Sequence, residues 1–166
     1  MSTIPFLRPG QPGDAVAWRD RAPVTRAQFR RDLAALAARL PDRPYVLNHC
    51  DDRYRFVVGL AAALSRGQVS LLPPNRAAEV LVQLKRDYPG VYCLTDQEQP
   101  EEAGTMDVVR YDTREADGEA ADPAFPAEQV VAIMFTSGST GVPKRHPKTW
   151  GALTHEARIA GQRLNG

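Results

Sequence analysis

Residues 45–72 read YVLNHCDDRYRFVVGLAAALSRGQVSLL. The apolar run Tyr45–Asn48 predicts a short buried strand, and Asp51 or Asp52 is suited to cap the helix that follows it. Gly67 is well placed to end that helix, and Val69–Leu72 predicts a second strand before two prolines. Two strands joined by a covering helix through short connections indicate a parallel sheet.

The same alternation continues on both sides of this stretch. Upstream, Thr25-x-x-Gln28 is a capping box: the Thr25 hydroxyl is expected to accept from the Gln28 N–H while the Gln28 side chain reaches back. An apolar stripe then predicts a helix that ends near Leu40. Downstream, Asn75 is suited to cap a third helix, and Val91–Leu94 predicts a third strand. The sequence therefore predicts an α/β fold with a mostly parallel sheet flanked by helices and right-handed crossovers.

The chain divides into three parts by composition. Residues 1–95 form the expected N-terminal α/β portion, residues 96–128 an acidic linker with room for one short strand at Met106–Tyr111, and residues 129–166 a strand, a loop and a helix. The linker has a net charge of −9, which leaves +10 on the remainder of a chain whose total is +1. The excess of basic residues could attract an anionic ligand, but the favoured interpretation is basic residues spread over helix faces beside a solvated connector.

Several classes of protein are not favoured by the composition. The longest apolar run, Phe56–Leu64, is nine residues long, whereas a membrane-spanning helix needs about 20. The N-terminus lacks the pattern of a secretory signal. Cys50 and Cys93 have no metal-binding spacing and are expected to be reduced thiols of a cytoplasmic protein. No cluster of lysines and arginines with interleaved aromatic residues favours a nucleic-acid partner.

The segment 135–144, FTSGSTGVPK, follows the apolar run Gln129–Phe135 and precedes an amphipathic pattern that begins at Trp150. This order predicts strand, loop and helix, with the loop at the carboxyl end of a strand, where open α/β sheets bind ligands. Glycines let a ligand approach the backbone, hydroxyls donate hydrogen bonds, and a lysine suits phosphate. The spacing is not that of a Walker A loop, and a polar surface loop without a ligand is the alternative. The candidate phosphate-binding residues are Thr136, Ser137, Gly138, Ser139, Thr140, Gly141 and Lys144.

The nine residues TSGSTGVPK resemble the phosphate loop of the adenylate-forming superfamily, which includes acyl-CoA synthetases, nonribosomal-peptide adenylation domains and luciferases. That motif is [ST]-[ST]-G-[ST]-T-G-x-P-K, and all eight defined positions match here. The resemblance covers most of residues 15–166, although only the loop is specific, and it implies an incomplete N-terminal portion of the adenylate-forming fold. The family usually has glycine after the lysine. Here Arg145 is expected either to contact a phosphate or a carboxylate or to face solvent.

The resemblance also implies an activity. The complete enzyme would join a carboxylic acid to ATP with Mg²⁺, release pyrophosphate, and pass the acyl group from acyl-AMP to the thiol of CoA or of a carrier protein's pantetheine. Lys144 is the implied catalytic residue. The family's other motifs lie downstream of the loop, and 22 residues follow Lys144, so the chain is expected to be an N-terminal fragment that is inactive alone and tends to self-associate.

Two other functions stay open. One is a stand-alone nucleotide- or phosphate-binding module, or a pseudoenzyme that acts with a partner. The other is a structural interaction domain that binds no nucleotide.

Overall fold

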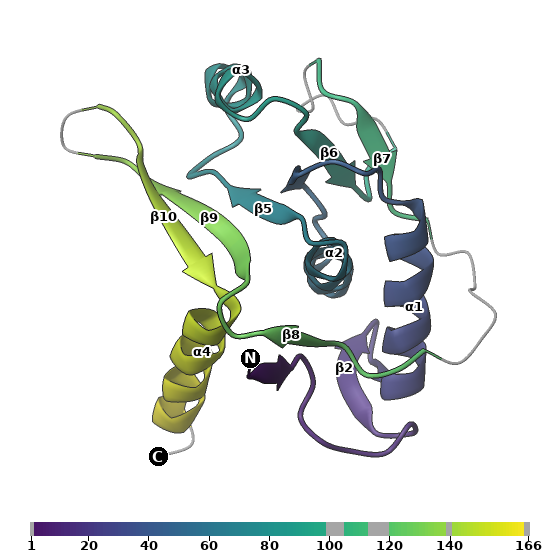
Figure 1. Ribbon diagram of the computed structural model, residues 1–166. Coiled ribbons are helices and arrows are strands. Elements are labelled where there is room, and N and C mark those ends of the chain that lie inside the picture. The colour runs from purple at the N-terminus through teal and green to yellow at the C-terminus, as the bar shows by residue number, and fades with distance from the viewer. Residues whose placement is uncertain (1, 99–104, 113–119, 139–140, 165–166) are drawn as a thin grey trace.

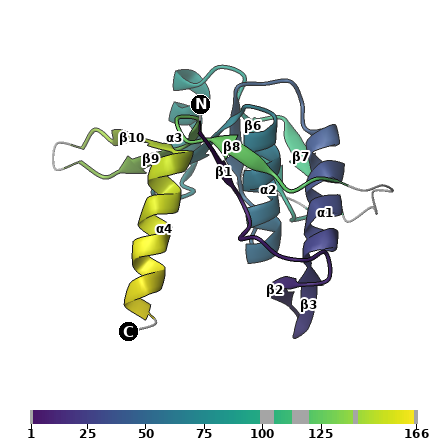
Figure 2. The same ribbon diagram turned by 60° about the horizontal axis from the view of Figure 1, so that its bottom comes forward.

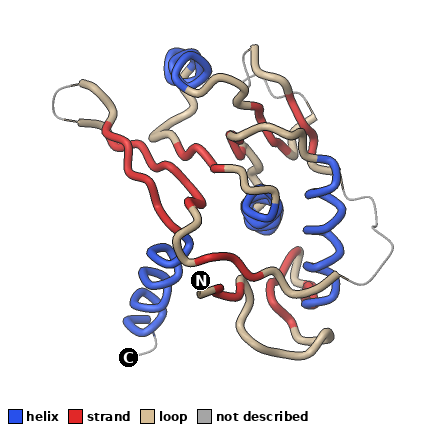
Figure 3. The backbone as a smooth tube through the Cα atoms, viewed as in Figure 1, coloured by secondary structure: helices blue, strands red, loops and turns tan. Residues whose placement is uncertain are grey.

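The computed structural model describes residues 2–98, 105–112, 120–138 and 141–164, and Figure 3 shows their helices, strands and loops by colour. The helices are α1 (Arg26–Arg39), α2 (Arg53–Ser65), α3 (Ala78–Asp87) and α4 (Trp150–Leu164). The strands are β1 (Thr3–Pro5), β2 (Ala15–Arg19), β3 (Ala22–Thr25), β4 (Tyr45–Asn48), β5 (Val69–Leu72), β6 (Tyr92–Thr95), β7 (Val108–Arg110), β8 (Ala124–Pro126), β9 (Val130–Thr136) and β10 (Lys144–Thr149).

Among the described residues, six strands form the central sheet in the order β10-β9-β5-β4-β6-β7 (Figure 1). β4 pairs in parallel with β5 and β6, β5 pairs in parallel with β9, and β6 pairs in parallel with β7. β10 pairs antiparallel with β9 at one edge. The prediction of an α/β fold with a mostly parallel sheet flanked by helices is confirmed. β7 lies within the segment 106–111, where the sequence leaves room for a strand.

The three middle strands β4, β5 and β6 have no exposed residue on either face, and consecutive side chains of a strand point to opposite sides of the sheet. Val46 packs in a cluster with residues of α1 and α2, whereas its neighbour Leu47 packs with Leu81 and Leu84 of α3. Val46 and Leu47 are both fully buried. Figure 1 shows α2 and α3 on opposite sides of β5. The sheet is therefore the middle layer of three.

Three local helix signals are present as the sequence predicts. The Thr25 hydroxyl accepts from the Gln28 N–H at 3.2 Å and so caps α1. Asp52 caps α2 by accepting from the Arg55 N–H at 2.8 Å. Gly67, just after α2, has φ +69°, a conformation that glycine adopts without the strain of a Cβ atom.

Two details of helix capping differ from the sequence-based prediction. The Gln28 side chain does not reach back to Thr25; it points along α1 and donates to Asp32 Oδ1 at 2.6 Å. Asn75 does not cap α3, which begins at Ala78 after an N-cap residue without a side-chain hydrogen bond. The Asn75 carboxamide oxygen accepts instead from the Ala77 N–H at 2.9 Å. It stabilises a turn two residues ahead of the helix cap, a bond that asparagine forms readily in turns.

The N-terminal segment crosses the structure and joins distant parts of the chain. β1 pairs antiparallel with β8, a strand for which the sequence carries no prediction. The Phe6 ring stacks on Phe29 of α1 and on Trp150 at the start of α4, with centroids 5.7 and 5.1 Å apart. The Trp150 indole N–H also donates to the Ile4 carbonyl at 2.9 Å. Figure 2 shows that α4 extends away from the rest of the fold beyond this contact.

Aspartates from residues 96–122 pair with arginines of the α/β portion. Asp122 receives hydrogen bonds from Arg30 and Arg26, which hold the pKa of its carboxyl below the ordinary value of 3.8. The pairs in this segment are Asp96–Arg55 (3.8 Å), Asp107–Arg43 (2.6 Å), Asp112–Arg39 (4.0 Å), Asp122–Arg26 (2.9 Å) and Asp122–Arg30 (2.7 Å). Four aspartates of this segment are therefore paired with arginines of the fold.

Gly59 of α2 is expected to be intolerant of a side chain. A Cβ atom there would lie 2.7 Å from Asn48 Nδ2 and 2.8 Å from Leu94 Cδ2. Asn48 Nδ2 is held by its hydrogen bond to the Phe56 carbonyl, at 2.9 Å. We expect Gly59→Ala to lower the free energy of unfolding by about 1–3 kcal/mol, because overpacking outweighs the helix propensity gained. Urea denaturation measures the change.

Gly161 of α4 is the matched control, since a Cβ atom there would meet nothing within 4 Å. Gly161→Ala is expected to leave the stability unchanged or to raise it by up to about 1 kcal/mol. Equal changes in the two variants would contradict the packing argument.

Candidate functional site

The loop predicted to bind phosphate lies at the end of a β-hairpin formed by β9 and β10, called the hairpin below. The helix that the sequence predicts from Trp150 is present as α4, but the strand β10 at residues 144–149 lies between the loop and this helix and was not predicted. β10 contains Pro147 and three basic residues, so it lacks a strand-like apolar pattern. β10 is an edge strand that pairs with β9 on one side, and proline is tolerated in edge strands.

The hairpin brings the two ends of the loop together. Thr136 and Lys144 are cross-strand partners, so their side chains leave the hairpin on the same face. His146 follows two residues after Lys144 and shares that face, and its Nε2 atom lies 3.1 Å from Thr136 Oγ1. All three residues are exposed. This face therefore presents a hydroxyl, an imidazole and an ammonium group to solvent.

The loop between these ends is partly described. Ser139 and Thr140 lie outside the described residues. Gly141 has φ +77°, the left-handed conformation expected of it, and its N–H donates to the Gly138 carbonyl at 3.1 Å. Ser137 is exposed and Gly138 half-buried. Residues 136–144 contain no carboxylate, so the loop itself suits an anion and offers no acidic ligand to a metal ion.

Arg145 points to the opposite face of the hairpin from Lys144 and contacts the end of α3. Its guanidinium lies 3.3 Å from Asp87 Oδ2 and 5.2 Å from the centre of the Tyr88 ring. The carboxylate that Arg145 contacts belongs to the protein itself, and a contact of Arg145 with a ligand stays a prediction. Its position on this face follows from strand alternation.

A groove of about 500 Å³ lies on the same face as Arg145. It is bounded by the segment that follows β5, by α3 and by the described part of the loop, and most of its lining is apolar. The lining residues include Pro74, Val80, Leu84, Phe135, Val142 and Arg145.

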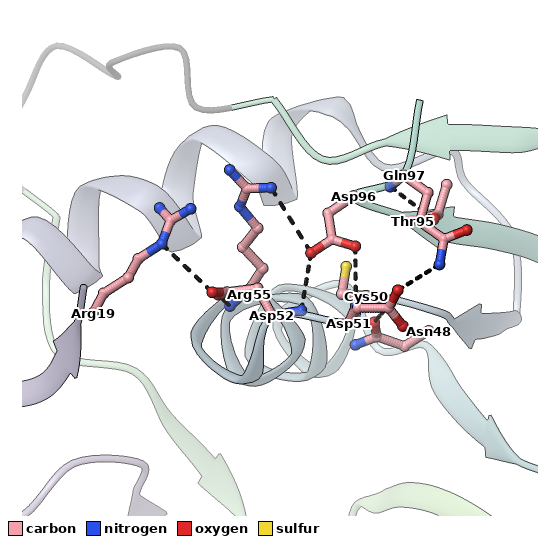
Figure 4. Close-up of polar contacts among 9 residues, drawn as sticks. All are labelled: Arg19, Asn48, Cys50, Asp51, Asp52, Arg55, Thr95, Asp96 and Gln97. Carbon is pink, nitrogen blue, oxygen red and sulfur yellow. Dashed lines mark hydrogen bonds and ion pairs between the residues drawn. The ribbon is translucent and has the colours of Figure 1, made fainter. Parts of the chain in front are cut away.

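A second group of polar side chains gathers where β4 and β6 end (Figure 4). The Asp96 carboxylate accepts from the backbone N–H groups of Asp51 (2.9 Å) and Asp52 (3.0 Å), and Arg55 lies 3.8 Å away. Hydrogen bonds from Gln97 and from an arginine hold the pKa of Asp51 below its ordinary value. Since these carboxylates are satisfied by the protein, the group stabilises the start of α2 rather than offering a ligand site.

The described residues contain no group of three or more histidine, cysteine or acidic side chains placed to hold a metal ion. Over the same part of the chain, no helix combines the length and the apolar character needed to cross a membrane.

No family model and no curated protein matches the chain. Among solved structures, a malonyl-CoA ligase complex with methylmalonyl-CoA and AMP is 25% identical with a TM-score of 0.69; the match covers 90% of this chain and 32% of that one. O-succinylbenzoate CoA synthetase from Bacillus subtilis, in complex with ATP and magnesium ion, is 22% identical with a TM-score of 0.69, over 92% of this chain and 44% of that one.

A third match is the N-terminal subdomain of NpsA from Klebsiella oxytoca in complex with 3-hydroxybenzoyl-AMSN, 21% identical with a TM-score of 0.62 over 83% of this chain and 37% of that one. The resemblance to adenylate-forming ligases is confirmed, and the fold is that of their N-terminal part. The chain spans less than half the length of these structures.

The two cysteines are expected to be unreactive in the folded protein. Both are buried thiols, and burial raises the pKa of Cys50 to about 12. At pH 8 only about one part in ten thousand of such a thiol is the reactive thiolate. We expect no reaction of Cys50 or Cys93 with an aromatic disulfide reagent at pH 8 until denaturant unfolds the chain, followed by absorbance. Rapid labelling of the native protein would show that the end of β4 is open.

Proposed function

We propose that this protein is part of a carboxylate-activating ligase and that its loop, Thr136–Lys144, holds the phosphate groups of ATP. The observation that carries the proposal is the cross-strand pairing of Thr136 with Lys144 on an exposed face of the hairpin. Lys144 forms no ion pair with any residue that the structure describes, so its ammonium group is available to an anionic ligand. The matches to ligase structures that contain AMP or ATP support the same assignment.

Each residue of the loop has a role in this proposal. Hydroxyls donate hydrogen bonds to phosphate oxygens, as do the backbone N–H groups of a loop that glycine leaves open to close approach. Lys144 is the catalytic residue, because its charge balances the negative charge that develops on the departing pyrophosphate. The proposed phosphate-binding set is Thr136, Ser137, Gly138, Ser139, Thr140, Gly141 and Lys144.

The proposed reaction has two steps. A carboxylate oxygen attacks the α-phosphorus of ATP, the bond to the β-phosphate oxygen breaks, and acyl-AMP and pyrophosphate form. A thiol of CoA or of a carrier protein's pantetheine then attacks the acyl carbon, AMP leaves, and the thiol proton is released. Mg²⁺ would reach the loop bound to phosphate oxygens, since residues 136–144 supply no carboxylate. Catalysis of this kind depends on positioning and charge balance.

We further propose that these 166 residues bind nucleotide without completing the reaction. The support is length: the match to malonyl-CoA ligase covers 32% of that chain. Nucleotide binding without turnover is also what a stand-alone binding module or a pseudoenzyme would show, so this second candidate predicts the same binding. Activity restored by a partner polypeptide would distinguish it.

Lys144→Ala is expected to weaken MgATP binding by tenfold or more, the order of one lost charge-assisted contact to phosphate. Thermal denaturation at increasing MgATP measures this, because a ligand of the native state raises its stability by RT ln(1 + [L]/Kd). Lys148→Ala is the matched control: Lys148 lies on the same strand but is paired with Glu156 at 2.5 Å. It should bind MgATP as the unaltered chain does.

Three outcomes would count against the proposal. Equal MgATP affinity in the unaltered chain and in Lys144→Ala would remove Lys144 from the site. No stabilisation by MgATP at any concentration would favour a structural interaction domain. Robust carboxylate-dependent exchange of pyrophosphate into ATP by the 166 residues would refute the claim that they are inactive alone.

A further inference from the structure

The far end of the hairpin has few partners in the fold. β5 pairs with β9 only from Ala132 to Met134, so Phe135 and Thr136 lie beyond the last residue of the neighbouring strand. β10 is the edge strand. Figures 1 and 2 both show the end of the hairpin extending past the rest of the sheet. A contact between this end of the hairpin and the rest of the fold would therefore also position the loop.

Arg145 provides such a contact. Its guanidinium forms an ion pair with Asp87 at 3.3 Å and lies over the Tyr88 ring at 5.2 Å. Both residues lie at the end of α3. Asp87 precedes Arg145 by 58 positions in the chain. A guanidinium suits this pair of partners because it can bind a carboxylate and stack on an aromatic face at once.

The two residues that Arg145 contacts, Asp87 and Tyr88, are themselves fixed by other contacts. Tyr88 is 5% exposed, and its ring packs edge-on against Tyr45 of β4 and Phe135 of β9, with centroids 4.9 and 5.9 Å apart. Gln83 donates to Asp87 Oδ1 at 2.9 Å, which leaves Oδ2 for Arg145. Arg145 therefore contacts a surface that is already ordered by the core.

Strand alternation connects this contact to the proposed phosphate site. Because adjacent residues of β10 point to opposite faces, holding Arg145 against α3 turns Lys144 toward the face that it shares with Thr136. We propose that Arg145 is a positioning residue: through Asp87 and Tyr88 it restrains the hairpin so that Lys144 and Thr136 are presented to phosphate. This inference rests on the proposed function only for the identity of the ligand.

The restraint can be measured without any ligand. Arg145→Ala is expected to speed hydrogen exchange of the backbone amides of residues 135–138, 141, 142, 144 and 145 by about three- to tenfold, the order set by one exposed ion pair and one cation–π contact. Asp87→Asn should speed it as well, and Arg145→Lys should restore part of the protection. Arg158→Ala, an exposed arginine of α4, is the matched control and should leave these amides unchanged. Unchanged exchange in Arg145→Ala overturns the inference.

Binding of MgATP tests the consequence for the site. Arg145→Ala should raise the Kd for MgATP by about three- to tenfold, and Asp87→Asn should raise it by no more than that, because it removes the ion pair and leaves the contact with Tyr88. The double variant should bind no more weakly than Arg145→Ala alone, because Arg145→Ala already removes the ion pair. If Arg145 instead touched phosphate itself, Asp87→Asn would release it and leave binding equal or tighter. That result, or unchanged binding in Arg145→Ala, overturns the positioning role.

The failure of the proposed function gives a different pattern. If the unaltered chain does not bind MgATP, the phosphate assignment is refuted, while hydrogen exchange still decides whether Arg145 restrains the hairpin and so positions Lys144 and Thr136. If Arg145→Ala lowers the melting temperature as much as a core substitution and Arg145→Lys does not restore MgATP binding, the contact is only structural and the inference is refuted.

Discussion

The pairing of β4 with both β5 and β6 is the constraint on which the other layers depend. A strand in this place must be apolar on both faces, and Val46 and Leu47 meet the requirement by pointing to opposite sides of the sheet. α1 and α2 cover one face because Val46 needs neighbours there, and α3 covers the other because Leu47 does. The helices are thus placed by the two faces of one short strand, and side-chain caps at Thr25 and Asp52 decide where α1 and α2 begin.

The candidate site follows from how this sheet is extended. β9 adds to β5 in parallel, so its carboxyl end points the same way as those of the other parallel strands. β9 continues for two residues past β5, and β10 returns along its free edge, which carries the loop away from the body. The contact of Arg145 with α3 connects that projecting end to the core through Tyr88. The loop is exposed enough to meet a ligand and is still anchored at its base.

What the sequence could predict was local. The caps at Thr25 and Asp52 and the turn at Gly67 are decided within a few residues, and the order of strands and helices follows from apolar patterning. The motif predicts a phosphate loop from nine consecutive residues, again a local signal. The hairpin was not predictable, because β10 is stabilised by pairing with β9 and its own residues are charged. The ion pairs of the acidic segment and the contacts of Arg145 join residues that are 41 or more positions apart in the chain, and no local pattern encodes them.

The strength of the Arg145 contact sets how firmly the end of the hairpin is restrained. The Arg145 and Asp87 side chains are 55% and 31% exposed, so solvent screens their ion pair. An exposed ion pair and a cation–π contact together stabilise a conformation by about 1–2 kcal/mol. That favours the closed contact over the open one by a factor of about 5–30. A glycine in place of Arg145 would remove this preference for the closed contact, whereas a buried ion pair would be screened less by solvent and would restrain the hairpin end more strongly. The contact therefore favours, in the absence of a ligand, the hairpin conformation in which Lys144 and Thr136 share one exposed face.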